Sequence, residues 1–94
     1  MRRKIFRYIK QLFRKYKIGK EYWIDIKDIK IPKNYKLHNI KQSKWNHKLK
    51  YWFETGEFES FILLRKDFTL IDGYSSYLIA NKYDLDFVPV YFVD

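Results

Sequence analysis

The hydrophobic period changes several times along this chain of 94 residues, which limits the chain to folds that mix helices with strands. Residues 22–31 alternate apolar and polar side chains with period two, as a half-buried strand does, and Pro32 ends this strand. Residues 34–42 predict an irregular connection. From Ser43 to a stop at Gly56 the spacing is helical, with an apolar stripe of Trp45, Leu49, Trp52 and Phe53. We expect Trp52 and Phe53 to be core residues, whereas Trp45 also suits base stacking.

The second half of the chain predicts a hairpin, a helix and a strand. The short apolar runs 61–64 and 69–71 flank a charged turn and indicate two strands. Asp72-Gly73 then opens a helix, with Asp72 as the expected N-cap and Asp84 in place of the usual C-terminal glycine. Residues 87–93 are typical of a strand, and Pro89 favours an edge strand or a strand start.

The N-terminus carries the whole net charge of +9, because nine Lys and Arg and no acidic residue lie in residues 1–20. Apolar side chains recur there with helical spacing and face away from the basic ones, which predicts a basic amphipathic helix over residues 1–20. Residues 21–94 carry eleven charges of each sign, and 51–94 hold eight of the eleven acidic ones. This separation of charge favours a polyanionic partner at the basic end.

The composition indicates one folded domain without disulfides. Hydrophobic residues make up 47% of the chain and aromatic residues 21%, enough for one compact core, and there is no cysteine. No apolar run reaches the roughly 18 residues of a membrane span. We expect a cytoplasmic protein, and the bias toward Lys, Ile, Asn and Tyr suggests a mobile element such as a phage.

The order of motifs after residue 28 resembles that of the ParB/sulfiredoxin-like superfamily. Five segments carry the resemblance: IKIP at 29–32, YWFETGEF at 51–58, FILLR at 61–65, TLIDGYSSYLIA at 69–80 and LDFVPVYFV at 85–93. They cover about two-thirds of the chain. The resemblance implies a small single α+β domain over residues 21–94, preceded by the basic helix of residues 1–20.

The Asp72-Gly73 helix start is the segment with chemical content. Free backbone N–H groups at a helix start bind anions, so Gly73, Ser75 and Ser76 are candidate phosphate-binding residues. In the superfamily, His and Arg commonly follow this glycine and hold nucleotide phosphates, and sulfiredoxins add a Cys. This chain has Tyr74 to Tyr77 there, so the resemblance implies a domain degenerate at its catalytic positions, without sulfinic-acid reduction.

Other chemistry has weaker support in the sequence. His38 and His47 have no zinc-type spacing, so we expect no metal site and no cofactor. Basic residues on the predicted helix 1–20 and around Trp45 are suited to the backbone of DNA or RNA. The candidate nucleic-acid-binding residues are Arg3, Arg7, Lys10, Arg14, Lys17, Lys41, Lys44 and Lys48.

The leading hypothesis is therefore a small non-catalytic ParB-like domain that binds nucleic acid through its basic N-terminal helix. A second is a phage or mobile-element inhibitor that binds an acidic or nucleic-acid-binding host protein complex, for example in defence. A third is residual nucleotide-binding or nuclease activity at Asp72-Gly73, so enzyme activity stays open, although a binding role is favoured.

Overall fold

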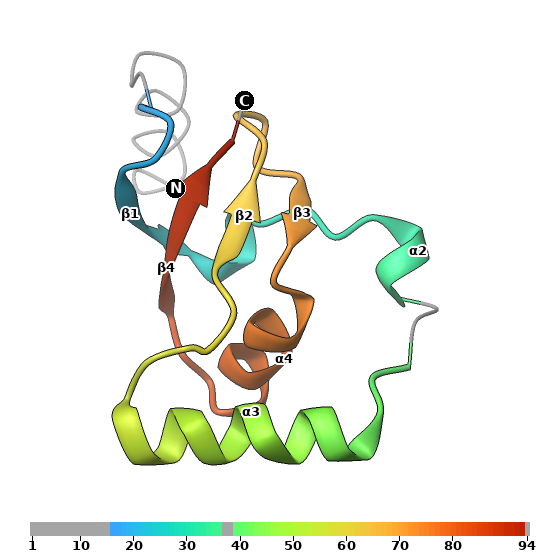
Figure 1. The fold of residues 1–94 in the computed structure, drawn as a ribbon. Coiled ribbons are helices and arrows are strands. Elements are labelled where there is room, and N and C mark those ends of the chain that lie inside the picture. The colour runs from blue at the N-terminus through green and yellow to red at the C-terminus, as the bar shows by residue number, and fades with distance from the viewer. Residues whose placement is uncertain (1–15, 37–38, 94) are drawn as a thin grey trace.

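A computed structural model describes residues 16–36 and 39–93 as one α+β domain. In chain order it contains strand β1 (Glu21–Asp25), the 3-10 helix η1 (Ile26–Asp28), helices α2 (Lys33–Lys36) and α3 (Gln42–Thr55), strands β2 (Ile62–Leu64) and β3 (Leu70–Asp72), helix α4 (Tyr74–Lys82) and strand β4 (Phe87–Phe92) (Figure 1). The predicted α+β class is confirmed. Residues 1–15 of the predicted basic helix lie outside the described residues.

The four strands form one mixed sheet in the order β1-β4-β2-β3. β4 pairs antiparallel with β1 and parallel with β2, and β2 and β3 form the predicted hairpin. The expectation that Pro89 marks an edge strand or a strand start is wrong, because β4 is a central strand. Pro89 is opposite Trp23 on β1, and pairing with β2 begins only at Val90, so the proline is tolerated just before the second ladder starts.

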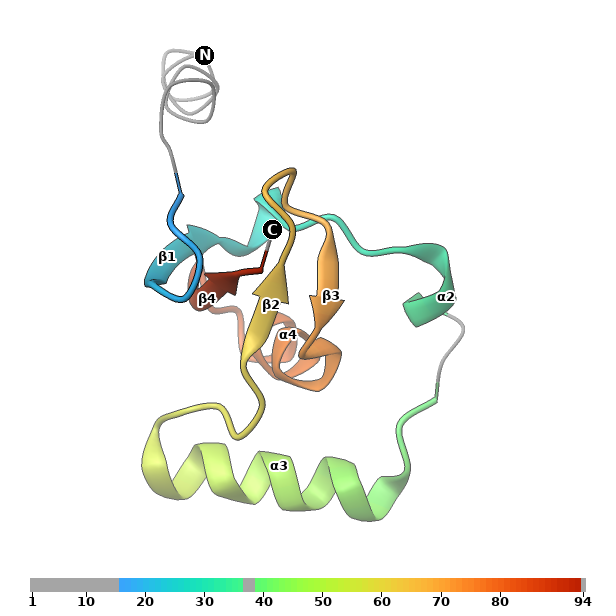
Figure 2. The same ribbon diagram turned by 45° about the horizontal axis from the view of Figure 1, so that its top comes forward.

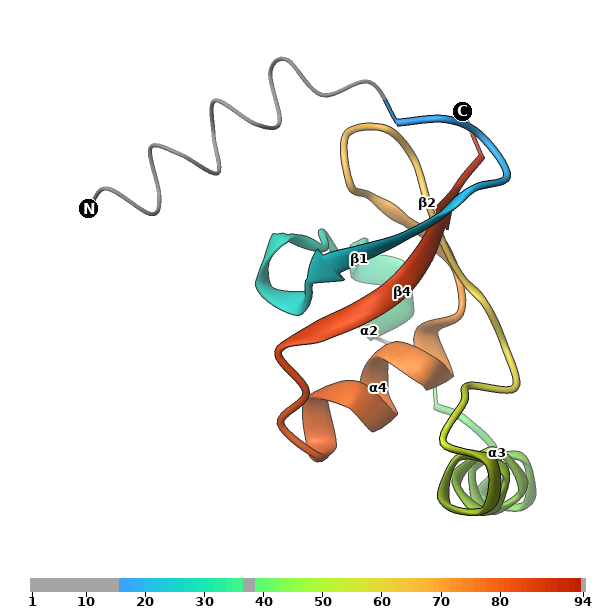
Figure 3. The ribbon, with the colours of Figure 1, turned by 90° about the vertical axis from the view of Figure 1, so that its left-hand side faces the viewer.

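Alternation along the strands separates a buried face of the sheet from an open one. In β4, Val88, Val90 and Phe92 are buried, whereas Phe87 is exposed and Pro89 and Tyr91 are half-buried. α4 covers the buried face, and its Ile79 and Ala80 are buried there. Figure 3 shows α4 below β4, and α3, seen end-on, at the lower right. None of the described helices covers the open face of β1 and β4.

The sequence prediction of α3 is correct in its bounds and wrong in its burial. Gly56 ends the helix in the left-handed region, at φ 73°, as predicted. No residue of α3 is buried, however, and Phe53 is 61% exposed. The helix crosses the lower end of the fold and packs on α4 rather than on the sheet (Figure 1). Trp52 accordingly packs at the edge of the domain, against Phe58 and Tyr83.

Local hydrogen bonds explain where other predicted elements differ. The predicted strand 22–31 stops at Asp25, because the Asp25 carboxylate accepts a hydrogen bond from the Lys27 amide and starts η1. The expected irregular connection after Pro32 contains the short helix α2. Figure 2 shows α2 beside β3, where the Tyr35 hydroxyl donates a hydrogen bond to the carbonyl of Ile71.

The residues that precede β1 are not helical where the structure describes them. Ile18 forms an isolated β-bridge with Phe92, and Gly19 turns the chain at φ 80°. Tyr16 packs its ring against Tyr22, Phe68 and Phe92, with ring centroids 5.0, 5.6 and 4.4 Å away. The predicted helix over residues 1–20 therefore does not extend through residues 16–20.

Candidate phosphate-binding site

The N-cap of helix α4 is Gly73, one residue later than the predicted cap Asp72. Asp72 ends strand β3, and its carboxylate accepts a hydrogen bond from the Gly73 amide at 2.8 Å. Gly73 is the N-cap at φ 88°, and no side chain caps the helix. The N–H of Tyr77 bonds to the Gly73 carbonyl, so the amides of residues 74–76 precede the first intrahelical bond. These amides are the anion-binding groups of a helix start.

Three lysines lie on the face of α3 that is turned toward this helix start. Lys41 is the N-cap of α3, and Lys44 and Lys48 follow at intervals of three and four residues. This spacing places all three side chains on one side of the helix. Lys41 and Lys44 are exposed, and the half-buried Lys48 donates a hydrogen bond from Nζ to the Ser60 hydroxyl.

The lysines and the start of α4 line one pocket of about 460 Å³. Its wall includes Lys41, Lys44, Lys48, Gly73 and Ser75, all of which the sequence singled out. We call this hollow the lysine pocket; its other lining residues are Tyr35, Asn39, Ile40, Ser60, Asp72 and Tyr74. The volume lies within the range of about 300–1,000 Å³ that is usual for small-ligand sites.

The charges around the lysine pocket favour an anion. Its described lining includes three lysines and one acidic residue, Asp72. The positive end of the α4 dipole adds to the lysine charges. A phosphate group placed there would have lysine ammonium groups and helix amides as donors in one hollow, and both kinds of group bind phosphate in proteins.

The two serines of the predicted phosphate site have different positions. Ser75 is buried and lines the lysine pocket. Ser76 is 2% exposed, and its hydroxyl donates a hydrogen bond to the Ser60 carbonyl at 2.6 Å. Ser76 is not among the residues that line the pocket. Its hydrogen bond to Ser60 instead joins α4 to the segment before β2.

Sequence reasoning missed the aromatic wall of the pocket. The rings of Tyr35 and Tyr74 lie 5.3 Å apart between centroids. Tyr35 belongs to α2, which lies where the sequence predicts an irregular connection. Tyr77 follows on the same helix, α4. Burial raises the pKa of its phenol, and Tyr74 has a smaller effect in the same direction.

The other predicted binding residues lie elsewhere. Arg3, Arg7, Lys10 and Arg14 are outside the described residues. Lys17 is exposed, and its backbone amide donates a hydrogen bond to the Tyr22 hydroxyl at 2.9 Å. His38 is also outside the described residues, and His47 pairs with Glu59 at 2.8 Å. Within residues 16–36 and 39–93, no cluster of three His, Cys, Asp or Glu side chains could hold a metal ion.

No protein-family model matches the sequence, and no curated protein matches it either. Solved structures do match. A structure of the Pnob8-like ParB-N domain has a TM-score of 0.67 and 20% identity, over 80% of this chain and 30% of that one. The C-terminally truncated chromosome-partitioning protein ParB from Caulobacter crescentus, in complex with CTP-γ-S, has a TM-score of 0.61 and 15% identity, over 81% and 45%.

A second structure of the pNOB8-like ParB N-domain has a TM-score of 0.58 and 22% identity, over 80% of this chain and 28% of that chain. The domain therefore has the fold of a ParB N-domain, and the predicted fold is confirmed. The chain spans less than half the length of each of these structures. Among the described residues, none of the helices is long and apolar enough to cross a membrane.

Proposed function

We propose that this chain is a ParB-like domain that binds the phosphate groups of nucleic acid, with the lysine pocket as one contact. One observation carries the proposal: Lys41, Lys44 and Lys48 gather around the first turn of α4 in a single hollow. Ammonium groups and free helix amides bind phosphate oxygens without regard to base sequence. We therefore expect binding that falls steeply with salt and discriminates little between sequences.

The second contact in this proposal is the basic N-terminal segment. It carries Arg3, Arg7, Lys10, Arg14 and Lys17, and only Lys17 is among the described residues. The support is the charge itself, because residues 1–20 hold nine basic side chains and no acidic one. Each phosphate that a Lys or Arg neutralises releases condensed counterions, which drives binding at low salt.

A free nucleotide is the second candidate ligand for the lysine pocket. It is favoured by the likeness in fold to the ParB structure complexed with CTP-γ-S. The pocket volume of about 460 Å³ suits a ligand of that size. The sequence departs from the superfamily here, because Tyr74, Ser75 and Ser76 replace its usual His and Arg, so Lys41, Lys44 and Lys48 would have to supply the charge.

The test is binding of labelled DNA and RNA oligonucleotides, and separately of CTP and ATP, at about 50 and 200 mM salt. The informative variant is Lys41→Glu with Lys44→Glu, since both side chains are exposed and their replacement should leave the fold intact. The matched control is Lys27→Glu with Lys66→Glu, which changes the net charge equally at exposed sites outside the pocket.

Nucleic-acid binding predicts that the pocket variant loses at least about tenfold more affinity for oligonucleotides than the control does. Loss of binding to CTP or ATP alone would identify a nucleotide site instead. Equal effects of both double variants would contradict a role for the pocket, because they would show that only the net charge of the chain matters.

A further inference from the structure

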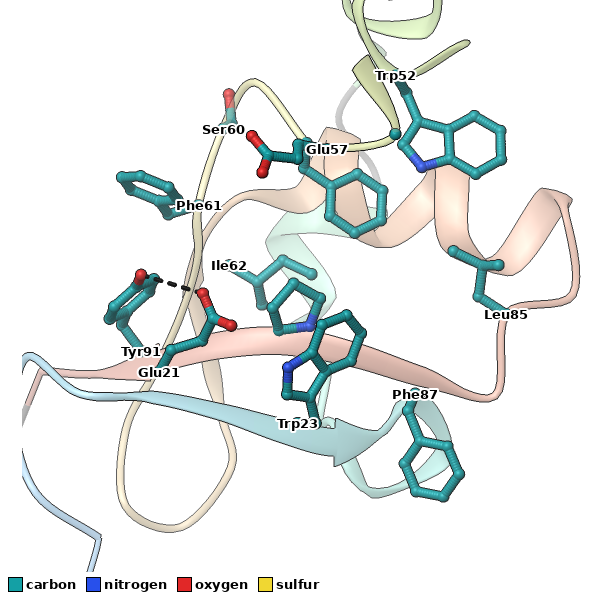
Figure 4. Close-up of a pocket in the computed structure, with 13 residues that line it drawn as sticks. Glu21, Trp23, Trp52, Glu57, Ser60, Phe61, Ile62, Leu85, Phe87 and Tyr91 are labelled. Atoms are coloured by element: carbon teal, nitrogen blue, oxygen red, sulfur yellow. Dashed lines mark hydrogen bonds between the residues drawn. The ribbon is translucent and has the colours of Figure 1, made fainter. Parts of the chain in front are cut away.

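An aromatic groove lies on the open face of the sheet, and it shares the lining residue Ser60 with the lysine pocket. Its walls include Trp23 from β1, Phe87 from β4, Phe61 before β2 and Trp52 near the C-terminal end of α3 (Figure 4). Phe58, which follows α3, also lines the groove. The groove has a volume of about 480 Å³. Trp23, Phe61 and Phe87 are 63%, 66% and 56% exposed. Large aromatic side chains gathered at one exposed site indicate a docking surface.

The charge of the groove is the opposite of that of the chain. The whole chain carries +9, yet the described residues that line the groove include Glu21 and Glu57 and no Lys or Arg. Glu21 accepts a hydrogen bond from the Tyr91 hydroxyl at 3.3 Å. Desolvation raises the pKa of the Tyr91 phenol, and the negative charge of Glu21 raises it further. An apolar surface whose described charged side chains are acidic suits a partner that is apolar and basic, and it disfavours nucleic acid.

The chain itself contains a segment with this chemistry. In residues 3–17, apolar side chains repeat with helical spacing and the remaining face is basic. The apolar set is Ile5, Phe6, Tyr8, Ile9, Leu12, Phe13 and Tyr16. Docking of an amphipathic helix into an apolar groove is a common recognition mode, and here the charges of the segment and the groove are complementary.

The point of attachment favours the segment of another copy. Tyr16 packs on Phe92 and Phe68, on the buried face of the sheet, whereas the groove lies on the opposite face. Phe13 and Leu12 are only three and four residues from Tyr16. Even fully extended, three to four residues span only about 10–14 Å, which holds Leu12 and Phe13 near the buried face of their own sheet. The segment of a second copy has no such constraint.

We propose that the aromatic groove of one copy receives residues 3–13 of a second copy, so that two chains exchange these segments in a symmetric dimer while Tyr16 stays packed on its own sheet. Exchange in both directions closes the assembly, because each copy supplies one segment and one groove. The basic side chains remain on the outer face of each docked segment. This inference is independent of the lysine pocket and does not require nucleic acid.

The test is the molar mass of the full chain in solution by light scattering, from about 1 to 100 µM. The expected mass is twice the 11.8 kDa of one chain. Trp23→Glu places a negative charge at the groove wall. Ile9→Glu with Leu12→Glu places two negative charges on the apolar face of the segment. Both variants should give the mass of a single chain. Tyr51→Glu changes an exposed aromatic residue outside the groove and should leave the dimer unchanged.

A mixing experiment separates exchange between copies from docking within one copy. A tagged Trp23→Glu chain retains a segment, and an untagged Ile9→Glu, Leu12→Glu chain retains a groove. Exchange predicts that the tagged chain retains the untagged one on a resin. A single-chain mass at about 100 µM, or a dimer that survives the segment substitutions, would overturn the proposal, provided that circular dichroism shows each variant folded.

Discussion

The carbonyl oxygen of Phe61 lies so close to Gly73 that a Cβ built on Gly73 would be 2.3 Å from it. The same Cβ would lie 2.8 Å from the Cα of Ile62. Both contacts are with backbone, which cannot move aside as a flexible side chain can. The glycine between β3 and α4 is thus required by the packing of the chain on itself, in addition to any ligand at the helix start.

We predict that Gly73→Ala destabilises the domain far more than Gly56→Ala does. Gly56 also has a positive φ, of 73°, but a Cβ there would meet nothing within 4 Å. Its replacement should cost only the left-handed strain of about 1–2 kcal/mol. The clash at Gly73 should raise the cost above about 3 kcal/mol. Urea denaturation of both variants measures the difference, and similar midpoints would show that the β3–α4 junction relaxes easily.

The sequence was most informative about local structure. Gly56 marked the end of α3, and the pattern of residues 61–71 predicted the β2–β3 hairpin. Burial was less predictable, because a periodic stripe shows which side of a helix is apolar but not whether anything covers it. Trp52 and Phe53 have helical spacing suited to a core, yet α3 packs only at the end of the domain.

The candidate site was predicted in two separate pieces. The basic residues near Trp45 predict Lys41, Lys44 and Lys48, and the helix start predicts Gly73 and Ser75. Only the tertiary fold brings α3 and α4 to the same pocket. Tyr35 also lines this pocket, and its hydroxyl donates a hydrogen bond to the Ile71 carbonyl. Nothing in the sequence near Tyr35 indicates this contact, because Ile71 is far away along the chain.

Charge reversal on the N-terminal segment should abolish most nucleic-acid binding. With Glu at Arg7, Lys10 and Arg14, three attractive charges become repulsive. The dependence of log affinity on log salt should then flatten by about 0.9 per lost phosphate contact with duplex DNA. Titrations at several salt concentrations measure the slope. An unchanged slope and affinity would show that these three side chains do not contact phosphates.

The β2–β3 turn should make a small, pH-dependent contribution to stability. The Asp67 carboxylate accepts a hydrogen bond from the Thr69 amide at 2.9 Å, and its bonds to Thr69 lower the pKa of Asp67 from 3.8. Because the folded pKa is lowered, the stabilisation is present above about pH 4 and is lost as pH falls through the folded value.

Asp67→Asn should therefore show a shallower loss of stability between pH 4 and 2 than the parent chain does. The asparagine oxygen can still accept the Thr69 bond, so the variant isolates the charge from the turn geometry. Thermal unfolding across this pH range provides the comparison. Parallel stability curves for the two proteins would contradict the expected contribution of Asp67.

The two neighbouring serines should separate binding from stability. Ser76→Ala removes the donor to the Ser60 carbonyl in a site only 2% exposed, so it should destabilise the domain by about 1–3 kcal/mol. Ser75→Ala removes a hydroxyl that lines the lysine pocket and should weaken phosphate binding with little change in stability. Urea unfolding and oligonucleotide titration of both variants test the assignment. If Ser75→Ala leaves the affinity unchanged, phosphate contact at α4 must come from backbone amides alone. If Ser76→Ala weakens binding without destabilising the fold, the roles given to the two hydroxyls are wrong.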